Sequence, residues 1–234
     1  MNSLLATQLG RALLGWILLT SAAHAALQID GVPNEPEWQS ARHITDFKVV
    51  QPLTKGDSKQ PMEVWLLPTP EGLAVAFHSS QDAAAPRSRQ RTQRDQYGSV
   101  DRVNLVVDYD GEGGTGYNFT LTLGQGVMDA VVSNENVFRQ DWDSDWQHAI
   151  AEQADGWTAE MLIPWHVAPM KRTSYGKRTL GVYFDRVIAS TGERVAWPAI
   201  SYFDPPLPAG GKSRDESKSR EAALANRLVE EIDG

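Results

Sequence analysis

Residues 100–123 read VDRVNLVVDYDGEGGTGYNFTLTL, and this stretch decides the fold. Apolar and polar residues alternate on both sides of a glycine-rich segment, residues 110–114 (DGEGG). Alternation with a period of two residues is typical of a β-strand with one buried face. A short glycine-rich loop between two such strands predicts a hairpin. The stretch therefore predicts two neighbouring antiparallel strands.

The same pattern continues on both sides of that hairpin. Alternating runs bounded by turn residues occur at residues 62–67, 73–77, 146–152, 157–163, 180–184 and 195–200. Turns about every 8–12 residues are typical of a sandwich of two antiparallel sheets. We therefore predict an all-β protein with the architecture of a β-sandwich.

The first 25 residues have the order of a secretory signal peptide. The basic residue Arg11 precedes an apolar run, residues 12–20, and small residues follow as far as Ala25. This order predicts cleavage after Ala25 or Ala26 and a periplasmic or secreted protein. The apolar run is too short for a membrane-spanning helix, which needs about 20 residues. We therefore expect the mature protein not to span a membrane.

The net charge and the lack of cysteine exclude disulfides and argue against one class of partner. The chain has no cysteine and a net charge of −8. Because no disulfide can form, the fold must depend on its own apolar core. Nucleic acid is not expected as a partner, because it binds surfaces with concentrated positive charge.

Composition also predicts the domain boundaries. We expect the signal peptide at residues 1–25, the β-sandwich domain at 26–203, a linker rich in proline and glycine at 204–211, and a polar tail at 212–234. The spacing of apolar residues in the tail favours a weak amphipathic helix. Residues 83–96 contain four arginines without apolar spacing and are expected to form a long exposed loop.

Several motifs occur in an order that resembles family 9 carbohydrate-binding modules. They are Ile29-Asp30-Gly31 with Glu35 to Trp38, residues 100–108 (VDRVNLVVD), Gly116 to Phe119, residues 142–146, residues 155–164 (DGWTAEMLIP), and Trp197-Pro198. Within the family, the sequence is similar to the module that precedes an outer-membrane β-barrel in bacterial surface proteins. The resemblance implies a β-sandwich, carbohydrate binding, often a structural calcium ion, and no catalytic machinery.

The candidate ligand residues are aromatic rings that could stack on a sugar and polar groups that could bind its hydroxyls. They are Trp142, Trp197, Arg94, Arg102, Asn104 and Asn118. Family members that bind sugar are similar in clamping it between two tryptophans, but residues 91–98, before the central strand, contain none. The polar strand positions are equally typical of an ordinary solvent-facing sheet face.

The remaining tryptophans of the domain are expected to be structural. Trp157 alternates in phase with Ala159 and Met161, which places it on the apolar face of its strand. Trp38 belongs to the opening motif and is expected to anchor packing. Trp146 is interpreted as a core residue too.

Carboxylates at the glycine-rich turn are candidate ligands for a structural calcium ion. Asp108, Asp110 and Glu112 would supply the oxygen atoms that Ca²⁺ prefers. A second acidic run, residues 141–145, superficially follows the spacing of a helical calcium loop. Trp146 stands where that loop requires glycine, so we reject the match.

No enzyme class has support in the sequence. There is no cysteine nucleophile, no H-E-x-x-H or G-x-S-x-G motif, and no carboxylate pair that stands out for glycoside hydrolysis. Two alternatives to carbohydrate binding remain. One is a structural accessory domain that docks on an outer-membrane protein. The other is a haem-binding electron-transfer domain, with candidate ligands His78, His148, Met62, Met128 and Met161.

Overall fold

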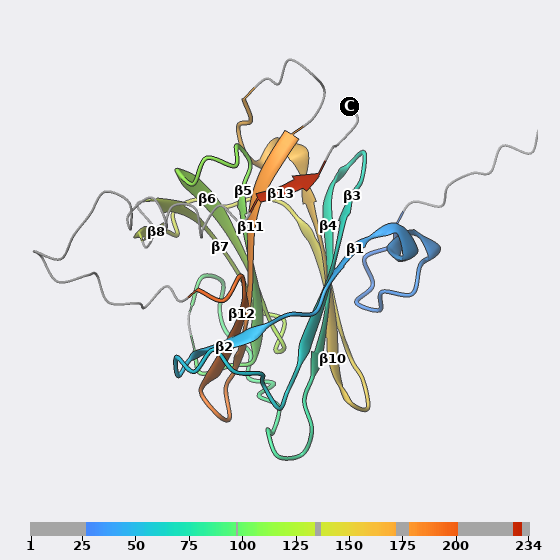
Figure 1. Cartoon of the computed structure of the whole chain (residues 1–234), viewed down its shortest axis with the longest axis vertical. Coiled ribbons are helices and arrows are strands. Elements are labelled where there is room, and N and C mark those ends of the chain that lie inside the picture. Colours follow the sequence, from blue (N-terminus) through green and yellow to red (C-terminus); the bar gives the residue numbers. More distant parts are fainter. Residues whose placement is uncertain (1–26, 97, 134–136, 172–177, 201–226, 231–234) are drawn as a thin grey trace, which may run out of the picture.

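Two antiparallel sheets pack face to face in the computed structural model of this chain (Figure 1). The structure describes residues 27–96, 98–133, 137–171 and 178–200, and the backbone of residues 227–230. The predicted signal peptide, the predicted linker and the rest of the predicted tail lie outside the described residues. The all-β sandwich predicted from the alternating pattern is confirmed.

The smaller sheet, sheet A, has five strands in the order β1-β3-β4-β10-β9. These are β1 (Arg42–Ile44), β3 (Met62–Pro68), β4 (Gly72–Ser80), β10 (Gly156–Pro164) and β9 (Gln147–Glu152). Both hairpins predicted in this part of the sequence form, since β3 pairs with β4 and β9 pairs with β10.

The larger sheet, sheet B, has the order β2-β12-β11-β5-β6-β7-β8, and β13 also pairs with β11. Its strands are β2 (Lys48–Gln51), β12 (Glu193–Trp197), β11 (Arg178–Ile188), β5 (Arg102–Asp108), β6 (Thr115–Thr122), β7 (Val127–Ser133), β8 (Val137–Arg139) and β13 (Arg227–Glu230). The β5–β6 hairpin is the one predicted from residues 100–123. Strands β2, β7 and β8 were not predicted.

The helix expected in the C-terminal tail is wrong for residues 227–230, which form strand β13. β11 is longer than its neighbour β12 and pairs with it only from Phe184 onward. The backbone groups of Arg178 to Gly181 are therefore open on that edge, and β13 pairs with them. An unpaired strand edge favours a further strand because each backbone N–H and C=O needs a partner.

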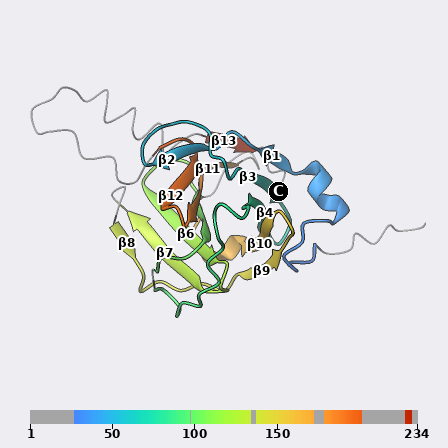
Figure 2. The same ribbon diagram turned by 90° about the horizontal axis from the view of Figure 1, so that it is seen from below.

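Two short 3-10 helices complete the described fold. They are η1 (Pro36–Ser40), which lies outside sheet A in both ribbon views, and η2 (Trp165–Val167) (Figures 1 and 2). Within the described part of the chain, no helix is both long enough and apolar enough to cross a membrane.

Alternate residues of the facing strands form one apolar core between the sheets. Its fully buried members include Val64, Leu66, Val75, Phe77, Leu105, Phe119, Ala159, Met161, Val182 and Phe184. Trp157 and Trp146 belong to this core, and Trp38 to a smaller cluster on the outer face of sheet A. The structural role predicted for these three tryptophans is confirmed.

The loop at residues 83–96 contains neither helix nor strand, as predicted. Three of its arginines, Arg87, Arg89 and Arg94, are paired with carboxylates. Arg87 and Arg89 both contact Glu152, at 3.2 Å and 2.5 Å. Ala85, a residue of the loop, is buried, so the loop packs on the sandwich.

Glu160 holds the N-terminal segment on the outer face of sheet A. Its Oε2 accepts hydrogen bonds from the backbone N–H groups of Asp30 (3.0 Å) and Gly31 (2.8 Å). Its Oε1 accepts one from Nε1 of Trp38 (3.0 Å). Gly31 has a φ of +94°, and a Cβ there would lie 2.6 Å from the backbone carbonyl carbon of Ile150. The opening motif of the sequence is therefore a packing motif.

Arg186 is buried between the two sheets and links them. From β11 its Nη1 donates to three carbonyl oxygens of sheet A and its connections, those of Gln60 (3.2 Å), Pro61 (3.3 Å) and Ser80 (2.8 Å). Its Nη2 donates to Oε1 of Gln81 (2.9 Å). Burial lowers the pKa of Arg186 to about 10, so the side chain is still charged at neutral pH.

The same network reaches the central strand and the core tryptophan. Oε1 of Gln81 also accepts a hydrogen bond from Nε1 of Trp157 (3.2 Å), and its Nε2 donates to Oδ1 of Asp101 (3.1 Å). Asp101 is itself buried and accepts hydrogen bonds from the backbone N–H groups of Ser88 and Ala189. Asp101, the second residue of the VDRVNLVVD motif, is thus part of the polar network between the sheets.

Replacing Arg186 by methionine is expected to lower the free energy of unfolding by about 3–5 kcal/mol. The change leaves three carbonyl groups and Asp101 without their cationic partner in a site that water does not reach. Denaturant unfolding of wild type and Arg186→Met measures the loss. Arg89→Met, an exposed arginine with one carboxylate partner, should leave the midpoint nearly unchanged. Equal midpoints for the two variants would contradict the linking role of Arg186.

Stability is expected to depend on pH through Glu160. Burial raises the pKa of its carboxyl group above the ordinary value. A group of this kind stabilises the fold most below its ordinary pKa, and the contribution is lost as pH rises through the raised pKa. The free energy of unfolding of wild type, relative to Glu160→Gln, should therefore fall as pH rises above the ordinary carboxyl pKa of about 4. Denaturant titrations across this range test it, and a constant difference would contradict it.

Candidate functional site

A row of hydrogen-bonded polar side chains crosses the outer face of sheet B. Nδ2 of Asn118 donates to Oγ1 of Thr120 (3.0 Å), which donates to Oδ1 of Asn104 (2.6 Å). Nδ2 of Asn104 donates in turn to Asp185. Beyond it, Nη1 of Arg194 lies 3.7 Å from Oδ2 of Asp185. We call these five residues the polar row.

Strand register explains why the polar row forms. Asn104 lies opposite Thr120 on β6 and opposite Asp185 on β11. Side chains directly opposite each other point to the same face of a sheet, so the three meet. Asn104 and Asn118 are only 7% and 5% exposed. Their hydrogen bonds offset the cost of burial and hold each amide in one orientation.

A shallow apolar hollow adjoins the polar row on the same face. It holds about 50 Å³ and is lined by Val106, Gly116, Val132 and Tyr183, among others. Val106 lies opposite Asn118 in the sheet register, so the hollow and the row are neighbours. Gly116 keeps the floor of the hollow low, because a Cβ there would lie 2.8 Å from Cγ1 of Val106.

Arg102 lies on the same face as the polar row, opposite Thr122 of β6. Its side chain is half-buried, and its Nη1 donates to the carbonyl oxygen of Gly98 (3.3 Å). The structure thus brings three of the predicted ligand residues, Arg102, Asn104 and Asn118, to one face. An apolar floor beside oriented amides and guanidinium groups can hold a small ligand that is rich in hydroxyls.

The two predicted stacking rings lie on the opposite, inner side of sheet B. Trp197 is opposite Phe184, with ring centroids 6.2 Å apart, and Arg42 lies over its ring at 5.9 Å. Trp142 packs edge to face on Tyr117 and Phe119, at 5.1 Å and 6.0 Å. Both rings are half-buried against the main core. The structure therefore brings neither ring to the polar row.

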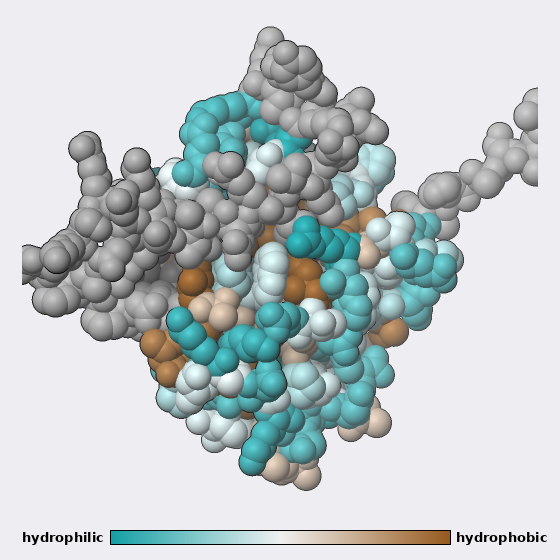
Figure 3. Space-filling model, in the orientation of Figure 1, coloured by the Kyte–Doolittle hydropathy of each residue, from teal (hydrophilic) through white to brown (hydrophobic). Residues whose placement is uncertain are grey.

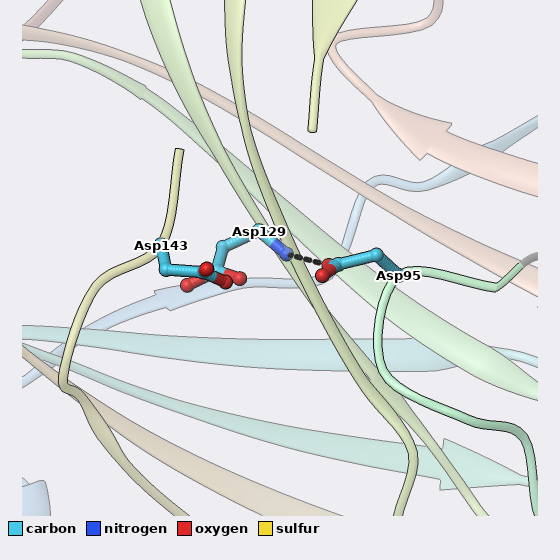
Figure 4. Close-up of side chains that lie close together, drawn as sticks. All are labelled: Asp95, Asp129 and Asp143. Carbon is cyan, nitrogen blue, oxygen red and sulfur yellow. Dashed lines mark hydrogen bonds between the residues drawn. The ribbon is translucent and has the colours of Figure 1, made fainter. Parts of the chain in front are cut away.

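Arg94, the sixth predicted ligand residue, lies elsewhere and pairs with Asp95, Asp129 and Asp143. Figure 4 shows these three aspartates. Oxygen atoms of Asp95, Asp129 and Asp143 lie within 4.8 Å of one another, and they form the one such acidic group in the part of the chain that the structure describes. Nη2 of Arg94 donates to Asp129 (2.6 Å), and its Nε donates to Asp143 (2.8 Å). The guanidinium group supplies the positive charge that this cluster needs.

Asp129 is the buried member of that cluster. Its Oδ2 accepts hydrogen bonds from the backbone N–H of Ser144 (2.9 Å) and from Nε1 of Trp146 (3.4 Å). Burial raises the pKa of Asp129, and the neighbouring Arg94 opposes this rise. Asp129 and Arg94 together tie the loop at residues 141–146 to β7.

The calcium site predicted at Asp108, Asp110 and Glu112 finds no support in the geometry. Asp108 instead organises the hairpin turn, because its Oδ1 accepts from the backbone N–H of Asp110 (3.0 Å) and its Oδ2 from that of Gly113 (2.6 Å). Lys171 binds Glu112 through its ammonium group and Asp110 through its backbone N–H. The carboxylates of these three residues do not converge on one point.

The predicted haem ligands are spread over several faces of the two sheets. Met62 and Met161 lie in the core between the sheets, and Met128 lies on the outer face of sheet B, opposite Thr120. His78 lies on the outer face of sheet A, and its Nε2 is 3.5 Å from Oδ2 of Asp155. His148, on β9, packs against the ring of Trp146. The five side chains do not converge on one site.

Comparisons with known proteins give a similarity of fold. No family model matches the chain, and no curated protein matches it in sequence. Two solved structures of a family 9 carbohydrate-binding module from Caldicellulosiruptor kristjanssonii are similar to it. The complex with glucose is 12% identical in sequence and has a TM-score of 0.48. The match covers 74% of this chain and 81% of the module. The complex with cellotriose is 10% identical in sequence and has a TM-score of 0.46. The match covers 74% of this chain and 80% of the module. Likeness at this level does not bear on the ligand of this chain.

Removing Arg94 is expected to convert its aspartate cluster into a site that responds to calcium. Arg94→Ala leaves Asp95, Asp129 and Asp143 close together without a cation, which should lower the melting temperature. Calcium should then raise the melting temperature of the variant, because a ligand that binds only the folded state stabilises it. Thermal unfolding with calcium and with chelator tests this. Arg89→Ala should show no new calcium effect, and a similar response in Arg94→Ala and wild type would contradict the proposed role of the arginine.

Proposed function

We propose that this chain is an exported, non-catalytic carbohydrate-binding domain that binds a poly- or oligosaccharide on the outer face of sheet B. The observation that carries the proposal is the polar row, with its oriented side chains beside an apolar hollow. A pyranose ring presents an apolar face and a rim of hydroxyl groups, so it needs both kinds of surface. Export rests on the signal peptide predicted at residues 1–25.

The chemistry of the face suits hydroxyl groups. A hydroxyl both donates and accepts, and amides, hydroxyls and guanidinium groups supply the complementary partners. Arg102 is the least buried of the polar candidates on this face, and its guanidinium group can donate two parallel hydrogen bonds to neighbouring hydroxyls. Val106, which is half-buried, lines the hollow and would contact the apolar face of the ring. Because the side chains of the polar row are already held in place, binding costs little conformational entropy.

The same arrangement supports binding without catalysis. Asp185, the carboxylate of the polar row, accepts a hydrogen bond from Asn104 and lies beside the guanidinium group of Arg194. The polar row therefore contains a single carboxylate, and that carboxylate is already paired within the row. A glycosidase of the usual kind needs a second carboxyl group that carries a proton.

A docking domain is the second candidate, and the exposed surface favours it less. Among the described residues, the large hydrophobic side chains that are well exposed are Leu53 (53%) and Val137 (49%). Hydrophilic residues cover much of the described surface visible in Figure 3, with small hydrophobic patches between them. Stable protein–protein interfaces usually have a more continuous apolar centre.

Loss of the Arg102 side chain is expected to weaken carbohydrate binding without unfolding the domain. Arg102→Ala removes a charged hydrogen-bond donor from the proposed face, which should reduce affinity about tenfold. A glycan array first identifies the oligosaccharide, and calorimetric titration then compares the variants. Arg89→Ala, on the loop at residues 83–96, should bind as the wild type does. If the two variants bind alike, or if no glycan binds the wild type, carbohydrate binding at this face is contradicted.

A further inference from the structure

The polar row on the outer face of sheet B has a direction, because each of its hydrogen bonds fixes the next one. Asp185 supplies a carboxylate oxygen, which only accepts, so Nδ2 of Asn104 donates to it. Oδ1 of Asn104 then accepts from the hydroxyl group of Thr120 (2.6 Å). The oxygen of that hydroxyl accepts in turn from Nδ2 of Asn118 (3.0 Å). The carboxylate at one end of the row thus sets the orientation of the amide at the other.

The row ends in a hydrogen-bond acceptor, Oδ1 of Asn118. The side chain is only 5% exposed, and among the described residues no donor reaches this oxygen. The atom is not sealed inside the protein, so a ligand can reach it. A nearly buried acceptor without a partner is costly, and a ligand donor would remove that cost. The end of the row therefore selects an N–H or O–H group.

The hollow beside Asn118 takes a small apolar group. It is lined by Gly116, Val132 and the half-buried Val106, which lies opposite Asn118 in the sheet register. Its volume of about 50 Å³ is far below the roughly 300 Å³ at which pockets begin to enclose a whole drug-sized ligand. A sugar ring can lie across the rim of the hollow, but only a substituent of the ring can enter it.

One substituent found on sugars combines a donor with a small apolar group that points the same way. In a planar trans amide, the N–H lies on the side opposite to the carbonyl oxygen. In an acetamido group the methyl carbon lies on the same side as the N–H, so both can face a protein surface while the carbonyl oxygen faces water. A hydroxyl group offers a donor without the methyl group.

We infer that the outer face of sheet B binds a sugar that carries an N-acetyl group. The N–H of the acetamido group donates to Oδ1 of Asn118, and its methyl group lies in the hollow beside Val106 and Val132. Arg102 lies four residues from Val106 on β5, about 13 Å at the rise of a strand, so it contacts a more distant ring of an oligosaccharide. This inference rests on the proposed carbohydrate function and names the class of sugar that the same face selects.

Two trisaccharides with the same backbone separate the acetamido group from the sugar ring. Triacetylchitotriose carries an acetamido group on each ring where cellotriose carries a hydroxyl, and the two are otherwise alike. In calorimetric titration of the full chain, triacetylchitotriose should bind about tenfold more tightly, because a buried methyl group and a new hydrogen bond add to the affinity. Equal affinity, or a preference for cellotriose, would overturn the inference.

Filling the hollow should remove this preference. A Cβ at Gly116 would lie 2.8 Å from Cγ1 of Val106, so Gly116→Ala takes up the space of the methyl group. The preference for triacetylchitotriose should fall from about tenfold to less than about threefold. Gly56→Ala is the matched control, because a Cβ there has only Thr54 within 4 Å and neither glycine has a positive φ. A preference that survives in Gly116→Ala would place the acetyl group elsewhere and contradict the inference.

Asp185 is tested as a positioning residue. Asp185→Asn replaces a group that only accepts by one that also donates, so the amides of the row can turn over and Asn118 no longer presents its oxygen alone. The ratio of the two affinities should fall about threefold. A general loosening of the face would weaken both trisaccharides alike and leave the ratio unchanged, which would contradict the directional row. Asp143→Asn, at an exposed aspartate paired with Arg94, should change neither affinity.

The inference and the proposed function can fail separately. If both trisaccharides bind equally and Arg102→Ala weakens both, carbohydrate binding at this face stands and the N-acetyl preference is overturned. If neither trisaccharide and no other glycan binds the wild type, both proposals fail. L-fucose offers a methyl group and hydroxyls without an amide. Tighter binding of fucose than of N-acetylglucosamine would reassign the hollow to a 6-deoxy sugar and overturn the inference.

Discussion

A charged guanidinium group buried between two sheets is the constraint on which the rest of this structure depends. Arg186 must find several acceptors, and it finds them in backbone carbonyl groups at the ends of β3 and β4. These hydrogen bonds set the position of sheet A on sheet B at that end of the sandwich. They also hold Gln81, which orients Trp157 and Asp101. A domain without disulfides thus uses a polar network, in addition to apolar contacts, to align its two layers.

The two outer faces of the sandwich differ because of a second buried ionisable side chain, Glu160. Glu160 draws the N-terminal segment across sheet A, where Trp38 covers Ala74, Ala76 and Leu162. On sheet B, the cover that the described residues provide is Ala199 and Ile200, which pack on the part around Val50 and Tyr183. The polar row lies beside this covered part. The packing of one chain segment against sheet A thus explains why the candidate ligand face belongs to sheet B.

The candidate site was only partly predictable from the sequence. Alternation along β5 and β6 placed Asn104 and Asn118 on one polar face, and the structure agrees. Trp197 was expected beside them, but it follows Ala196, which lies opposite Asp185 of the polar row. The period of two therefore directs Trp197 to the inner face. Seeing this requires the pairing of β12 with β11, which no local pattern reveals. Arg194 belongs to the polar row because of the same strand pairing. The pattern of its own segment did not predict this.

The sequence by itself determined strands β3 to β6 and β9 to β12, their hairpins and the apolar core, because each depends on neighbours within a few residues. Alternation set the buried face of β5, and the glycine-rich turn set the hairpin that follows it. Tertiary structure alone decided which charges meet. Arg94 lies 49 residues from Asp143, Glu160 lies 129 from Gly31, and Arg186 lies 126 from Gln60. Residues 227–230 likewise became a strand because β11 offered an open edge. Such contacts depend on the order of strands across a sheet and on the packing of one layer on another.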